Sequence, residues 1–246
     1  MAGRVTHKGF TIIETMLVLG ISGLMLAGVM ASVGAGIAAQ RYKDAANATV
    51  DYFQGQYNFA TNVRNDRGSD SYCSSGGIST TPAAAFRATT DCTVLGRVIR
   101  GSGVDASSSP LYATVDADTL RGESDPLVAL KKSNIVEDAA LKETYTLEWG
   151  ARLYPVGNRG GTQSYTIAII RSPFTGVVST FIDTTSSSTA INALIDKSDA
   201  LSTDAKFCLD ASGSMLGVNS ERLGVRIAAN SVNSSGVTLM GDGGGC

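Results

Sequence analysis

The fold of this chain is determined near its start, by the stretch Gly9-Phe10-Thr11-Ile12-Ile13-Glu14 and by the apolar run that follows it to Ala39. Residues 15–40 contain no charged side chain over 26 positions. A helix of that length would measure about 39 Å, enough to cross a hydrocarbon core of about 30 Å with some tilt. The residues Arg4, His7 and Lys8 precede it, and this basic flank is expected to stay in the cytoplasm.

Glu14 narrows the interpretation, because a carboxylate at mid-bilayer costs about 2.5–3.5 kcal/mol or more and usually has a partner and a task. A secretory signal peptide would keep its apolar core uncharged and end in a small-x-small cleavage site. Here Gly9 and Phe10 stand between the basic and the apolar parts instead. The pattern therefore disfavours an ordinary signal peptide cut near Ala38 or Ala39, and also an unprocessed single-pass anchor.

The run Lys8-Gly9-Phe10-Thr11-Ile12-Ile13-Glu14 resembles the class III signal of type IV prepilins and pseudopilins. The resemblance covers residues 1–60 and is specific, because the glycine, the aromatic residue and the glutamate all have the family's spacing. In that family a membrane-embedded aspartyl peptidase cuts after the glycine and methylates the new N-terminus. The resemblance thus implies cleavage between Gly9 and Phe10, N-methylation of Phe10, and a role in assembly for Glu14.

Composition excludes several other classes of protein. The only histidine, His7, lies in the predicted leader, so the mature chain has no imidazole for a metal or for a Ser-His-Asp or Cys-His mechanism. Without Arg4 and Lys8, the mature chain carries 18 basic and 22 acidic residues, a formal charge of −4, which does not suggest a strongly basic nucleic-acid binder. We expect no enzyme, no catalytic residue and no cofactor, although carboxylate-only or lysine-based chemistry is not removed by this argument.

The four cysteines are Cys73, Cys92, Cys208 and Cys246, and no two form a C-x-x-C pair that would indicate zinc or a thioredoxin-like motif. An even count in a domain outside the cytoplasmic membrane indicates disulfides. Of three possible connectivities we favour Cys73–Cys92 with Cys208–Cys246, because local closure is entropically easiest. The alternative is four reduced, buried thiols.

The apolar helix is expected to continue beyond the membrane. The residues Ala46, Val50, Phe53, Tyr57 and Ala60 recur at steps of four and three, which places them on one helical face. No proline occurs in residues 10–65, so a helix over residues 10–63 would be about 80 Å long. The glycines at positions 20, 23, 28, 34 and 36 are compatible with close helix packing in lipid, with melting outside the bilayer as the resemblance suggests, or with a loose anchor.

The rest of the chain indicates a loop-rich connection followed by a sheet. We expect a strand over residues 94–100, a loop over 101–110 and a short helix within 127–142. Residues 145–154, 163–171 and 177–183 are expected to form an antiparallel meander, because short turn-forming segments separate them. A helical turn over residues 190–196 and strands over 206–209, 223–228 and 237–240 complete the prediction.

Two sequence patterns suggest a metal site and are set aside. The run Asp210-Ala211-Ser212-Gly213-Ser214 spells the D-x-S-x-S motif of von Willebrand factor A domains, but too little chain follows it to complete that site. An acidic stretch contains Asp105, Asp116, Asp118, Glu123 and Asp125. It fails as an EF-hand, since position 12 counted from Asp116 is a leucine, so we expect a solvated loop and no metal, with calcium binding by this loop as the open alternative.

We therefore expect an α+β, type IV pilin-like protein with a long N-terminal helix, one half in the membrane and one half amphipathic, packed on an antiparallel sheet. Its parts would be a leader peptide (residues 1–9), a transmembrane and filament-core helix (10–39), an amphipathic helix (40–65) and an extracytoplasmic globular head (66–246).

The resemblance implies a structural subunit of a type IV pilus or pseudopilus. Its partners would be prepilin peptidase, other pilin subunits in a helical filament, the inner-membrane assembly platform and membrane lipid. It would cross the cytoplasmic membrane once, with its N-terminus inside, and lie in a cell-surface filament after assembly. The alternative is a minor or tip pilin whose head acts as an adhesin or in DNA uptake, although no residue pattern supports DNA or a surface ligand. The choice among pilus, secretion and competence systems stays open.

Overall fold

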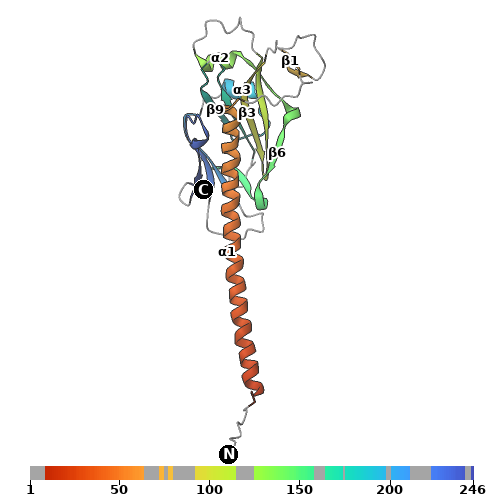
Figure 1. Ribbon diagram of the computed structural model, residues 1–246. Helices are drawn as coiled ribbons and strands as arrows, with labels where there is room; N and C mark the ends of the chain where they lie inside the picture. Colours follow the sequence, from red (N-terminus) through yellow and green to blue (C-terminus); the bar gives the residue numbers. More distant parts are fainter. Residues whose placement is uncertain are drawn as a thin grey trace, which may run out of the picture.

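The computed structural model describes residues 9–63, 72–74, 77–79, 92–114, 125–157, 164–173, 175–197, 201–210, 223–241 and 245–246. Its longest element is the helix α1 (Ile12–Thr61), which has 50 residues and is therefore about 75 Å long. Figure 1 shows the N-terminal half of α1 projecting from the head and its C-terminal half lying along one face of the head. The single long helix and the mixed α+β architecture that the sequence predicted are both present.

The head contains two larger antiparallel sheets and one small one. The first sheet has the order β5-β4-β3-β8-β9, with β6 paired to β4; its strands are β3 (Cys92–Ser102), β4 (Asp105–Thr114), β5 (Asn134–Glu137), β6 (Glu143–Thr146), β8 (Ser164–Arg171) and β9 (Val178–Asp183). The second has the order β12-β11-β10-β7; its strands are β7 (Arg152–Pro155), β10 (Ala205–Asp210), β11 (Gly224–Ile227) and β12 (Val237–Met240). The hairpin of β1 (Tyr72–Ser74) and β2 (Gly77–Ser79) is separate.

The short helices lie between these strands. They are α2 (Pro126–Lys132), α3 (Ile191–Lys197) and the 3-10 turns η1 (Ala139–Leu141), η2 (Glu148–Gly150) and η3 (Ser234–Gly236). Asp125 caps α2, since its side chain accepts a hydrogen bond from the backbone N–H of Leu127 at 2.8 Å. The short helix expected within residues 127–142 is present as α2, which begins one residue earlier, and the chain enters β5 directly after it.

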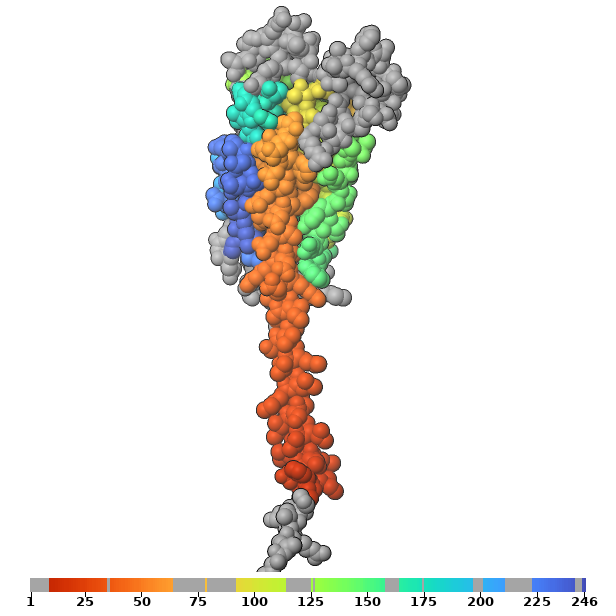
Figure 2. Space-filling view, viewed as in Figure 1, coloured from red at the N-terminus to blue at the C-terminus, as the bar shows by residue number. Residues whose placement is uncertain are grey.

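The six-stranded sheet is covered on both faces. Ile167 and Ile169 of β8 pack in the core formed with α1, whereas Ala168 and Ile170 pack in a second core that includes residues of α3. This two-sided burial follows from the period of two in a strand, and it explains why β8 is apolar at consecutive positions. In the space-filling view of Figure 2, α1 lies between the blue C-terminal strands on one side and the green segment that contains β6 on the other.

Two strand predictions were wrong. Residues 101–110 were expected as a loop, but β3 continues to Ser102 and β4 begins at Asp105. The serines of β4 gave no hydrophobic signal, yet Ser108 and Ser109 are buried because β3 and β6 flank the strand.

Residues 145–154 were expected as one strand, and the structure divides them into β6, η2 and β7. The chain turns at Trp149 and Gly150, which have φ angles of 57° and 70°. As a result β6 pairs with β4, whereas β7 pairs with β10 in the other sheet. The predicted three-stranded meander is therefore wrong, and only its β8–β9 hairpin is present.

The predicted disulfide between Cys208 and Cys246 is present, and the two Cα atoms are 5.5 Å apart. Cys92 is also disulfide-bonded. The side chain of Cys73 lies outside the described residues, so its pairing with Cys92 remains a prediction. Most of the acidic stretch and the D-x-S-x-S residues after Asp210 also lie outside the described part of the chain.

Replacing Cys208 and Cys246 together by alanine should lower the free energy of unfolding by about 2–4 kcal/mol. The bond joins residues separated by 38 positions and therefore constrains the unfolded chain. Urea unfolding of the full chain in detergent measures the difference. Equal midpoints for the variant and the wild-type protein would contradict this contribution.

Candidate functional site

The N-terminal motif forms the exposed start of α1. Gly9 and Phe10 precede the helix, and the Phe10 side chain is 78% exposed. Thr11 caps the helix, because its hydroxyl oxygen accepts a hydrogen bond from the backbone N–H of Glu14 at 3.2 Å. The Thr15 hydroxyl donates to the Ile12 carbonyl at 2.9 Å and so needs no outside partner. The helix therefore begins directly after the predicted cleavage site.

Gly9 is not required by packing within this chain. A Cβ atom built on it would meet no atom within 4 Å. Any need for glycine at this position must therefore come from another molecule that approaches the backbone. Glu14 lies in the first turn of α1, where the helix dipole favours a negative charge. No described residue pairs with its carboxylate.

The protruding half of α1, residues 12–40, is apolar on all sides and packs against nothing in the described head. None of its described side chains is buried. It is long and apolar enough to cross a membrane. The large exposed apolar side chains are those of Ile12, Ile13, Met16, Leu17, Val18, Leu19, Ile21, Leu24, Met25, Leu26, Val29, Met30, Val33 and Ile37. Such a surface requires lipid or other protein around it. The five glycines of this half are all helical in the structure.

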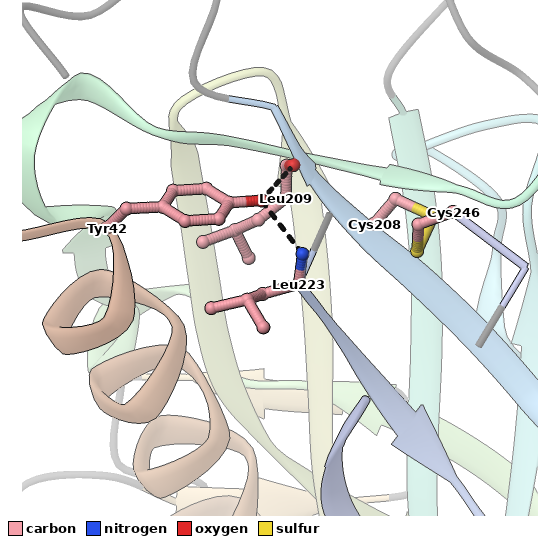
Figure 3. The surroundings of a disulfide bond; sticks show 5 residues. All are labelled: Tyr42, Cys208, Leu209, Leu223 and Cys246. Atoms are coloured by element: carbon pink, nitrogen blue, oxygen red, sulfur yellow. Dashed lines mark hydrogen bonds between the residues drawn. A yellow bond between two sulfur atoms is a disulfide. The ribbon is translucent and has the colours of Figure 1, made fainter. Parts of the chain in front are cut away.

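The packed half of α1, residues 42–61, begins at Tyr42, which is buried. Figure 3 shows its hydroxyl between β10 and β11, where it donates to the Leu209 carbonyl at 3.0 Å and accepts from the Leu223 N–H at 2.9 Å. The Cys208–Cys246 disulfide lies beside these contacts. Tyr42 thus fixes the point at which α1 enters the head.

The rest of the packed half is held along its length. The predicted apolar face is buried as expected, at Ala46, Val50, Phe53, Tyr57 and Ala60. The Phe53 ring stacks on Phe207 at 6.2 Å between centroids. At the far end the Tyr57 hydroxyl is 2.7 Å from the Thr180 hydroxyl. The Arg171 guanidinium donates a hydrogen bond to the Thr61 carbonyl at 3.2 Å. A positive charge is favourable there, because the C-terminus is the negative end of the helix dipole.

Another tyrosine of α1, Tyr52, is half-buried, and its hydroxyl oxygen is shielded from solvent. The Tyr52 ring stacks on Tyr145 with centroids 4.3 Å apart, and neither buried hydroxyl has a hydrogen-bond partner. Burial raises the pKa of the Tyr52 hydroxyl to about 12, so Tyr52 stays protonated at neutral pH. The tyrosine pair contributes packing between α1 and β6, and Tyr52 does not serve as a base.

One contact could not be predicted from the sequence. It lies at the base of the head, which is the end from which the protruding half of α1 emerges. The Arg41 guanidinium lies 4.6 Å from the centroid of the Trp149 ring, and the ring is half exposed. Trp149 has φ 57° and ψ 20°, a left-handed conformation that costs a bulky residue about 1–3 kcal/mol. The sequence signal was weak: Arg41 is the first charge after the apolar run, and Trp149 precedes a glycine inside an apparent strand.

Several depressions on the described surface of the head are open to solvent. One is lined by residues that include Arg100, Asp105 and Lys142. Arg100 is already engaged, because its guanidinium pairs with Glu137 at 2.8 Å and donates to two backbone carbonyls. No group of three histidine, cysteine or acidic residues suited to a metal occurs among the described residues. The features that require an outside partner are therefore concentrated on the protruding half of α1.

Comparisons with protein-family models, with the curated proteins and with solved structures find no match for this chain.

Replacing Tyr42 by phenylalanine should lower the free energy of unfolding by about 1–3 kcal/mol. The change leaves the buried Leu223 N–H and Leu209 carbonyl without their partner. Tyr52→Phe is the matched control, because that hydroxyl makes no hydrogen bond, and we expect it to be neutral or stabilising. Urea unfolding of the full chain in detergent compares the two. Equal losses for both variants would contradict the role assigned to Tyr42.

Proposed function

We propose that this protein is a structural subunit of a type IV pilus or a related pseudopilus. The observation that carries the proposal is the protruding half of α1, which is exposed and largely apolar, follows Gly9 and Phe10, and carries Glu14 in its first turn. The length and composition of this half suit a membrane before assembly and the core of a filament afterwards. The pilin-like arrangement, a helix with its second half packed on antiparallel sheets, supports the same proposal.

Before assembly, the precursor crosses the cytoplasmic membrane once, with its N-terminus inside and its head outside. The basic flank of Arg4 and Lys8 supports this orientation. Prepilin peptidase cuts between Gly9 and Phe10, which frees the amine of Phe10 for methylation. The open surroundings of Gly9 are compatible with a peptidase that must reach the backbone at this bond. The inner-membrane assembly platform then moves the mature subunit into the filament.

During assembly, the carboxylate of Glu14 pairs with the N-terminal ammonium of a neighbouring subunit. Glu14 is exposed in the isolated chain, one turn into α1, and no described residue of its own chain neutralises it. Among packed apolar helices the attraction between opposite charges is stronger than in water, and an unpaired carboxylate there would be penalised. The apolar helices form the filament core and the heads form its surface.

The first test is the N-terminus of the mature protein. In cells that contain prepilin peptidase, the purified chain should begin at a methylated Phe10, as measured by N-terminal sequencing and mass spectrometry. Gly9→Val should leave the leader attached, because its side chain obstructs the approach of the peptidase to the backbone. Gly3→Val places the same substitution within the leader and should be cleaved normally. A chain that begins after Ala38 or Ala39 would overturn the proposal.

The second test concerns Glu14. We expect Glu14→Gln to insert in the membrane and to be processed normally, since the amide has nearly the same shape and is less costly in lipid. Its incorporation into sheared filaments should fall strongly, because it lacks the charge that attracts the incoming ammonium. Asp51→Asn makes the same change at an exposed acid of the packed half and should assemble normally. Incorporation of Glu14→Gln at the wild-type level would exclude the carboxylate as the docking contact.

A further inference from the structure

The base of the head presents an aromatic ring and a cation just where the apolar part of α1 ends. Residue 40 is the last of the uncharged run, Arg41 follows, and Tyr42 is already buried. Trp149 is the only tryptophan of the chain, is 49% exposed, and lies against the Arg41 guanidinium. Its position therefore coincides with the boundary between the protruding half and the packed half of α1.

The Trp149 ring is held outward by its neighbours. Leu147 and Ala151, on either side, are buried. The Leu147 N–H donates to the Val104 carbonyl at 2.8 Å, and the Ala151 N–H donates to the Glu148 carbonyl at 3.1 Å. These contacts fix the turn and place Trp149 in its left-handed conformation. The backbone of Trp149 is therefore strained although its ring is left half exposed. This combination indicates that the ring contacts a partner outside the head.

We propose that Arg41 and Trp149 form an interfacial anchor, which lies in the outer headgroup layer of the membrane while the subunit is unassembled. Tryptophan is enriched at membrane–water interfaces because its ring is apolar and its N–H is polar. A guanidinium forms charge-assisted hydrogen bonds to lipid phosphates. This inference depends on one part of the proposed function, the insertion of α1 in the membrane. It does not depend on filament assembly.

The charges around the anchor fit a zwitterionic surface. Arg41 and Lys43 are basic, whereas Asp44 and Glu148 are acidic and exposed. The Asp44 carboxylate accepts a hydrogen bond from the Gln40 amide at 2.9 Å, so its charge lies beside the end of the apolar run. Because two basic and two acidic side chains balance one another, the anchor needs lipid phosphates and a membrane–water interface, but it does not need an excess of anionic lipid. Phosphatidylcholine is therefore a sufficient partner.

The anchor also sets the depth of Glu14. The 27 positions from Glu14 to Arg41 correspond to about 40 Å of helix. A bilayer is about 30 Å thick in its hydrocarbon core and about 40–45 Å with its headgroups. With Arg41 at the outer headgroups, Glu14 reaches the inner headgroups, and a tilt of about 20° shortens the span by only about 2 Å. The waiting subunit therefore keeps this carboxylate hydrated, and Glu14 leaves water only when it enters the filament.

The sole tryptophan makes the test direct. The full chain is reconstituted in phosphatidylcholine vesicles that carry bromine either near the carbonyl end or near the methyl end of the acyl chains. We expect Trp149 fluorescence to be quenched several-fold more by the shallow bromine than by the deep one. The matched control is Trp149→Phe combined with Val177→Trp. Val177 is also 49% exposed and lies beyond Arg171, which contacts the far end of α1, so its reporter should be quenched by neither lipid.

A second pair of variants tests Arg41. Arg41→Leu extends the apolar run and should shift the quenching of Trp149 toward the deep bromine. Lys43→Leu keeps Arg41 and should leave the ratio of shallow to deep quenching as in the wild-type protein. An Arg41→Leu ratio identical to wild type would remove Arg41 from the anchor.

The remaining outcomes separate this inference from the proposed function. A chain that floats with the vesicles while Trp149 is quenched by neither lipid, or is quenched more by the deep bromine, overturns the anchor and leaves the filament proposal intact. A folded chain that does not associate with the vesicles at all contradicts the membrane stage of the proposed function, and the anchor fails with it. Equal shallow quenching of Trp149 and of the Val177→Trp reporter would show that the head lies on the membrane without a preferred edge.

Discussion

The structure depends on the packing of one half of a single helix. Residues 42–61 of α1 bury one face against both large sheets, whereas none of the described side chains of residues 12–40 is buried. Because α1 is continuous, the direction of its protruding half is determined by the contacts of its packed half. Tyr42 makes such contacts at the start of the packed half, and Phe53 and Tyr57 make them about three and four turns further along. The head thus holds a membrane-length apolar rod in a defined orientation, which is the arrangement that a helical assembly of identical rods requires.

The same constraint explains the position of the C-terminal strands. Strand β10 ends and strand β11 begins where α1 enters the head, and the Tyr42 hydroxyl bonds to a carbonyl and an N–H at that end of their ladder. Cys246, the last residue, is joined to Cys208, next to the Leu209 whose carbonyl Tyr42 contacts. The disulfide therefore lies beside the point at which α1 enters the head. Tyr52, only ten positions further on, shows that burial of a tyrosine alone does not provide such a link, because its hydroxyl has no partner.

Elements with a local signal could be predicted from the sequence, and those that depend on distant partners could not. Residues close together in the sequence were sufficient to predict the apolar face of α1, the strand Val237–Met240 and the N-terminal motif. Strand β4 was missed because its serines are buried only by β3 and β6 on either side. The turn at Trp149 was missed because large and polar residues continue to alternate through it, as they do in a strand. The positive φ angle of Trp149 cannot be recognised from such a pattern. The contact between Arg41 and Trp149 follows from that turn, so it was equally hidden.

The uncharged run of residues 15–40 separates Glu14 from Arg41, and its length determines how deep Glu14 would lie if Arg41 were at the membrane surface. If the run were shorter by one heptad, about 10 Å, an anchor at Arg41 would draw Glu14 into the inner half of the hydrocarbon core. A carboxylate there would cost up to about 2.5–3.5 kcal/mol, or would pull the head away from the membrane surface. If the run were longer by the same amount, apolar residues would be left in water on the inner side. In the proposed membrane stage the observed interval would avoid both costs, and it would keep the charge of Glu14 available for the proposed ammonium partner in the filament.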